Sequence, residues 1–116
     1  MFLDGAMRNA RSAGVADTIS FRLGDATRLA ECLDEPPTHV VVNPPYGVRM
    51  RARGLRRLYR AFLRSLSDLA PGCRLVLITA ARGTFRRAAE AAGVEVLEER
   101  HILHGELKAS IFKCLV

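Results

Sequence analysis

A run of valines that ends in an amide, two prolines and an aromatic ring carries the clearest chemical signal of this sequence. It occupies residues 38–47, and its polar turn is Asn43-Pro44-Pro45-Tyr46. The valines favour a buried strand, because branched side chains are stiff and pack well in a sheet. Pro44 restricts Asn43 to extended backbone, and each proline fixes its own φ. We expect the Asn43 amide oxygen and both proline carbonyls to form a stiff set of acceptors that suits a substrate amine.

Positive charge is the second signal. The chain has 116 residues and a net charge of +6, and 16 of its 18 basic residues are arginine. This balance favours an anionic partner, with nucleic acid first, although an arginine-rich proteome would give the same excess. Seven arginines lie between Arg49 and Arg64 with no acidic residue among them. The candidate nucleic-acid contacts are Arg49, Arg51, Arg53, Arg57 and Arg60, and a solvated helix face is the alternative.

Composition bounds the remaining classes. Hydrophobic residues make up 49% of the chain, which allows a real core. The absence of a long apolar run and of a secretory signal predicts a soluble, cytoplasmic protein without membrane contact. The cysteines Cys32, Cys73 and Cys114 are widely spaced, so we expect no metal site and three reduced, structural thiols.

Helical and strand patterns alternate along the chain and must position the turn. The predicted helices cover residues 4–13, 27–33, 49–69 and 83–92, the last with Thr84 as a candidate cap. The predicted strands cover residues 17–23, 39–43, 74–80, 94–103 and 108–116. This order predicts one α/β domain over residues 1–116, with a mostly parallel sheet, helices on both faces and an antiparallel C-terminal hairpin.

Over essentially its whole length, the chain resembles the C-terminal part of a Rossmann-like methyltransferase that uses S-adenosylmethionine. More narrowly, it resembles the THUMP-containing tRNA guanine-N2 methyltransferases and related RNA methylases. The matching stretches are residues 5–10, 13–15, 24–26, 43–47, 58–59, 62 and 104–107. The Asn-Pro-Pro-Tyr motif is typical of methyl transfer to an exocyclic or amide nitrogen, and it does not separate guanine N2 from adenine N6 or protein glutamine.

The resemblance assigns roles to the turn residues. Asn43 and the Pro44 carbonyl would accept the hydrogens of the target amine, with Pro45 completing the turn. Tyr46 would stack on the flipped base, and loop packing is its alternative role. Positioning of the amine would then replace a general base.

The resemblance also implies a cofactor side. Asp25 and Ala26 would meet the adenine of S-adenosylmethionine, with Asn43 nearby, and a helix cap is the alternative role of Asp25. His101 and His104 are expected to shape the final turn without a catalytic role.

The family pattern places two strands and a glycine-rich cofactor loop before the helix at which this sequence starts. No Gly-x-Gly cluster occurs here. The resemblance therefore implies a partial methyltransferase domain that binds S-adenosylmethionine weakly or not at all by itself. We expect a five-stranded sheet, because residues 18–23 can move beside residues 39–43. Any edge left open needs a second copy or another chain, and a dimer is favoured.

Three functions remain open from the sequence. The first is methylation of guanine N2 in tRNA, once the cofactor half is supplied. The second is a non-catalytic remnant that binds RNA or a partner chain. The third keeps the methyl transfer and changes the substrate to N6 of adenine in DNA or to a protein glutamine.

Overall fold

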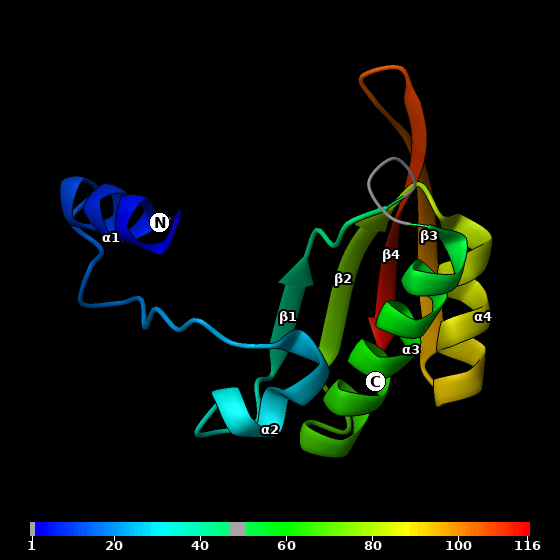
Figure 1. The fold of residues 1–116 in the computed structure, drawn as a ribbon, viewed down its shortest axis with the longest axis horizontal. Coiled ribbons are helices and arrows are strands. Elements are labelled where there is room, and N and C mark those ends of the chain that lie inside the picture. Colours follow the sequence, from blue (N-terminus) through cyan, green and yellow to red (C-terminus); the bar gives the residue numbers. More distant parts are fainter. Residues whose placement is uncertain (1, 47–50) are drawn as a thin grey trace.

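The computed structural model describes residues 2–46 and 51–116. Its helices are α1 (Phe2–Ser12), the 3-10 turn η1 (Ala26–Arg28), α2 (Leu29–Cys32), α3 (Ala52–Leu69) and α4 (Arg82–Ala92). Its strands are β1 (His39–Val42), β2 (Arg74–Thr79), β3 (Glu95–His104) and β4 (Leu107–Leu115). Figure 1 shows these elements along the chain.

The strands form one sheet in the order β1-β2-β4-β3. β1 pairs with β2 in parallel, and β4 is antiparallel to both β2 and β3. Three strands therefore run in one direction and β4 runs in the other. The expected α/β class and the antiparallel C-terminal hairpin are confirmed.

Helices α3 and α4 cover one face of this sheet (Figure 1). The apolar stripe of α3 is buried, as its spacing predicts. It packs against Phe85 of α4 and against alternate residues of β2 and β4. The rings of Phe85 and Phe112 lie 4.6 Å apart between centroids, so α4 and β4 share an aromatic contact. Gly93 ends α4 in the left-handed conformation at φ 70°, as predicted for a helix stop.

The predicted strand at residues 17–23 is absent, and the sheet has four described strands instead of five. Ile19 and Leu23 are 44% and 76% exposed. Arg22 donates to the Cys32 carbonyl at 3.0 Å and to Asp34 Oδ2 at 2.5 Å, so this segment lies beside α2. Its alternating pattern is that of a strand, but a strand needs a neighbour for its backbone groups, and no described strand pairs with it.

Two further expectations need correction. Helices pack on only one face of the sheet in the described residues, because α1 stands apart from it (Figure 1). On the outer strand, Val41 is 82% exposed. Thr84 is not the cap of α4, since the helix begins at Arg82 with Ala81 at the cap position and Thr84 lies inside the first turn. Among residues 2–46 and 51–116, no helix is long and apolar enough to cross a membrane.

Candidate active-site turn

The Asn-Pro-Pro-Tyr turn follows β1 at the carboxyl end of the strand, beside the end of β2. Asn43 and Pro45 are exposed, whereas Pro44 and Tyr46 are half-buried. Gly47, the last residue of the predicted motif, lies outside the described residues. Ligands of α/β sheets commonly bind at the carboxyl ends of strands, so this turn is placed where a substrate site is expected.

A buried pair of hydroxyl groups, from α3 and from the end of β2, holds the turn in place. The Tyr59 hydroxyl of α3 donates to the Pro45 carbonyl at 3.1 Å. It lies 2.6 Å from Thr79 Oγ1 at the end of β2, and Thr79 Oγ1 also accepts from the Ala81 N–H at 3.0 Å. Because the single Tyr59 proton is directed to Pro45, Thr79 must donate to Tyr59. Burial raises the pKa of Tyr59 despite the hydrogen bond from Thr79, so the phenol stays a donor at neutral pH.

His104 holds the turn from the other side. The Tyr46 hydroxyl lies 2.7 Å from Nδ1 of His104, the last residue of β3. The Tyr46 side chain also packs against the hydrophobic core. The ring therefore has contacts at both its body and its tip, which limits the orientations that it can adopt. Packing is thus shown for Tyr46, while base stacking stays a prediction.

The hydrogen bonds of the turn determine which of its acceptors remain available to a substrate amine. One lone pair of the Pro45 carbonyl is used by Tyr59, so Pro45 is less suited to a substrate amine than expected. Within residues 2–46 and 51–116, no hydrogen bond reaches the Asn43 side chain or the Pro44 carbonyl. These are the two groups that the family resemblance assigns to the amine, and their role stays a prediction.

Asp25 acts locally as a cap. Its Oδ1 accepts from the Thr27 hydroxyl at 2.7 Å and from the Thr27 N–H at 2.9 Å. The hydroxyl bond, followed by the backbone bond, lowers the pKa of Asp25, so the group is a carboxylate at neutral pH. The capping alternative is confirmed, and the adenine contact predicted for Asp25 and Ala26 remains untested.

The segment that follows Asp25 and Ala26, which are predicted to meet the cofactor, is attached to a different part of α3 than the Asn43 turn. The Leu29 N–H donates to Ser65 Oγ at 2.8 Å, in the second half of the helix, whereas the turn is bound to Tyr59 in the first half. A Cβ added at Gly24 would lie 2.4 Å from Cys32 Sγ, so a side chain at this position would collide with Cys32. Weak binding of S-adenosylmethionine by this chain alone stays a prediction. No group of three metal-ligating side chains gathers in the described residues.

The predicted nucleic-acid contacts separate into two groups. Arg51 and Arg53 are exposed at the start of α3, next to the turn in the chain. Arg57 and Arg60 are exposed further along and line a groove between α3 and α4. Arg49 lies outside the described residues. A solvated face and a binding face both fit this exposure.

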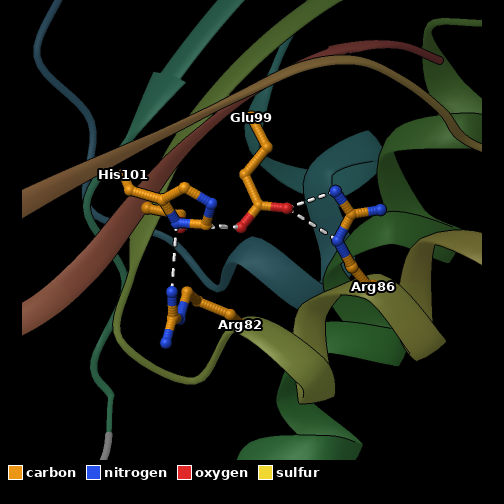
Figure 2. A network of polar contacts seen from close by, with 5 residues as sticks. Arg82, Arg86, Glu99 and His101 are labelled. Atoms are coloured by element: carbon orange, nitrogen blue, oxygen red, sulfur yellow. Dashed lines mark hydrogen bonds and ion pairs between the residues drawn. The ribbon is translucent and has the colours of Figure 1, made fainter.

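A polar network on the other side of α4 fixes that helix to the hairpin (Figure 2). Glu99 of β3 accepts from Arg86 Nε and from Ser110 Oγ, each at 2.7 Å. His101 Nδ1 lies 3.0 Å from the Arg82 guanidinium and 3.1 Å from Ser110 Oγ. His101 therefore links β3 to Arg82 of α4 and to Ser110 of β4, and it does not shape the final turn as expected.

Three residues of the site were not assigned to it from the sequence: Tyr59, Thr79 and His104. Tyr59 is in the apolar stripe of α3, where it reads as core, and it is 1% exposed. His104 is 58 positions from Tyr46. One signal in the sequence could have pointed to Tyr59: a tyrosine in a buried helix stripe needs a hydrogen-bond partner for its hydroxyl.

Comparisons with known proteins identify the family of this chain. The chain matches the RMKL-like methyltransferase domain family over residues 1–110 and belongs to it. It is 42% identical over 116 residues to a tRNA (guanine(6)-N2)-methyltransferase of Archaeoglobus fulgidus, covering 98% of this chain and 29% of the relative. A methyltransferase of the same name from Methanocaldococcus jannaschii is 41% identical over 113 residues, which is 96% of this chain and 29% of that relative.

Solved structures show the same fold. TrmN from Thermus thermophilus superposes with a TM-score of 0.81 and 28% identity, over 95% of this chain and 32% of that one. The methyltransferase SMU.472, complexed with SAH, has a TM-score of 0.74 and 20% identity, over 96% of this chain and 28% of that one. The chain thus spans under a third of the length of these relatives.

Proposed function

We propose that this chain is the substrate-holding part of an S-adenosylmethionine-dependent methyltransferase that acts on guanine N2 in tRNA. The observation that carries the proposal is the Asn43 turn. Its Asn43 amide and Pro44 carbonyl are unused within the described residues, while Tyr59 and His104 hold the flanking residues in place. The tRNA (guanine(6)-N2)-methyltransferase relatives support the substrate class.

The turn would work by orienting the amine. Two acceptors bind the two hydrogens of the exocyclic amine, so its lone pair is directed away from them toward the methyl donor. Tyr46 covers the face of the base and excludes water from it. When bound, S-adenosylmethionine supplies an electrophilic methyl group. The residues of this chain contribute orientation, and Asp25 keeps one carboxylate oxygen for the adenine amine.

Cofactor binding by the chain alone should be weak or absent, because the sequence has no Gly-x-Gly cluster of the kind that the family resemblance places around the methionine portion. Titration calorimetry of the 116-residue chain with S-adenosylmethionine should give no measurable heat of binding at micromolar concentrations. A nanomolar affinity would contradict this part of the proposal.

The proposal also includes a cytoplasmic location for the protein. It further includes a second chain, or a second copy of this chain, that pairs with the outer edge of β1.

Methyl transfer can be tested in a chimera. Residues 1–116 replace the matching segment of the Archaeoglobus fulgidus relative, and labelled S-adenosylmethionine is supplied with tRNA, duplex DNA or bulk protein. We expect label in tRNA, and mass analysis should identify N2-methylguanosine. Label in DNA adenine or in protein glutamine would shift the proposal to those substrates. A folded chimera that binds tRNA without methylating it would support a non-catalytic RNA-binding remnant.

A further inference from the structure

A groove lies between α3 and α4, and three guanidinium groups line it. Its volume is about 760 Å³. Arg57, Arg60 and Arg64 contribute one wall from α3, and alanines 88, 91 and 92 of α4 contribute the other. All three arginines are exposed. The small alanine side chains leave the guanidinium groups accessible across the width of the groove.

The arginines of the groove have no acidic partner within the described residues, unlike four other arginines of the chain. Arg22, Arg28, Arg86 and Arg100 each pair with a carboxylate. No ion pair joins Arg57, Arg60 or Arg64 to an acidic side chain among residues 2–46 and 51–116. One carboxylate, Asp68, lines the far end of the groove. The groove therefore carries uncompensated positive charge, and an anion can neutralise it.

The spacing of the arginines suits a polyanion. They recur three and four positions apart, so they form a row on one side of α3. From Arg57 to Arg64 this row rises about 10 Å along the helix axis. A stacked nucleic-acid strand advances about 3.4 Å per phosphate, so the row matches about three nucleotides. The row begins in the same half of α3 as Tyr59, which fixes the turn.

We propose that the α3–α4 groove binds the sugar–phosphate backbone of the RNA substrate, as a contact surface separate from the Asn43 turn. The choice of RNA as the anion rests on the proposed function. Guanidinium groups bind phosphate bidentately, and contacts of this kind fix the position of an RNA without reading its sequence. The groove brings together Arg57, Arg60 and Arg64, all members of the arginine run of α3.

Salt-dependent binding tests the groove without any methyl transfer. A tRNA transcript is titrated with the 116-residue chain at several salt concentrations. The triple variant Arg57→Gln, Arg60→Gln, Arg64→Gln should flatten the slope of log affinity against log salt by about 2, at roughly 0.7 per lost phosphate contact. Affinity near 0.1 M salt should fall about tenfold or more, equally for tRNA and for an unrelated single-stranded RNA.

A matched control removes the same charge elsewhere. The variant Arg11→Gln, Arg74→Gln, Arg100→Gln should change the slope by less than about 1, because these exposed arginines lie outside the groove. The charge-preserving variant Arg57→Lys, Arg60→Lys, Arg64→Lys should keep most of the slope, and it also shows that the groove tolerates substitution. Ser67→Glu, which adds a negative charge to the groove lining, should weaken binding with all three arginines present.

Three results would overturn the proposal. The first is an equal change of the salt slope in the groove variant and in the control variant. The second is an unchanged slope in the groove variant. The third is a groove variant that loses binding to poly-glutamate while its RNA binding stays intact. The last result would point to an acidic protein partner. Failure here is distinct from failure of the proposed function, because the methylation chimera reports on the Asn43 turn.

Discussion

At Tyr59, one hydroxyl group connects the candidate site to the sheet. Its donated hydrogen bond ends on the Pro45 carbonyl, and its accepted bond comes from Thr79, which is itself fully buried. A helix, a strand end and a turn therefore meet at one oxygen atom. Burial makes this contact valuable, since removal of one partner leaves other polar groups unsatisfied away from water.

The Tyr59→Phe variant should destabilise the chain by about 1–3 kcal/mol, because Pro45 loses its donor and Thr79 loses an acceptor. Urea unfolding at pH 7 measures this difference. Tyr46→Phe is the matched control, since it removes a hydroxyl whose His104 contact is exposed. It should change the free energy of unfolding by less than about 0.5 kcal/mol. Equal effects of the two variants would show that the buried hydroxyl does not fix the turn.

The three cysteines are free thiols in different surroundings. Cys73 and Cys114 are buried, and burial raises the pKa of Cys114 to about 11. A thiol reagent at pH 8 should therefore modify the half-buried Cys32 first and leave the other two unmodified until the chain unfolds. One thiol per chain under native conditions and three in urea is the expected titration. Rapid native labelling of Cys114 would contradict the described core.

Among the elements, α4 depends on its contacts with the hairpin. Arg86 and Arg82 on the helix bind Glu99 and His101 on β3, as Figure 2 shows. Burial alone would raise the pKa of Glu99, but the hydrogen bonds from Ser110 and Arg86 outweigh it and lower the pKa. Glu99 is therefore held as a carboxylate in the folded state.

This lowered pKa predicts a pH dependence. The stabilisation from Glu99 is present above its ordinary pKa of 4.5 and is lost as pH falls through the lower folded value. The stability difference between wild type and Glu99→Gln should therefore be full near pH 6 and shrink as pH falls below 4.5. Glu98→Gln, whose carboxylate is half exposed and pairs with Arg100, is the control and should show little difference at either pH. A constant Glu99→Gln difference across this range would contradict the described network.

Most elements could be predicted from the sequence because their signals are local. The apolar stripe of α3 and the valine and leucine runs of β1 and β2 determine their type without knowledge of their neighbours. Residues 17–23 have an equally clear strand pattern, yet they form no strand, because pairing depends on a partner that no local pattern reveals. The same holds for the candidate site. The Asn43 turn could be predicted because its signal is local, whereas the Tyr46–His104 contact could not, because it joins distant positions.

At the scale of the whole molecule, the chain has the fold of TrmN and spans 32% of that chain. The sheet order β1-β2-β4-β3 ends on one side at β1, and Val41 on this edge strand is 82% exposed. On the proposed function, this open edge is where a second copy or another chain would pair.

The central claim is that Asn43 orients the substrate amine, and single-turnover methyl transfer in the chimera tests it most directly. Asn43→Ala should slow the methyl-transfer step about 10²–10³-fold, as expected when a positioning contact is lost. Affinities for tRNA and for S-adenosylmethionine should stay within about twofold of the unmodified chimera, because the amide serves orientation. An unchanged rate for Asn43→Ala, or a loss fully explained by weaker tRNA binding, would contradict the account.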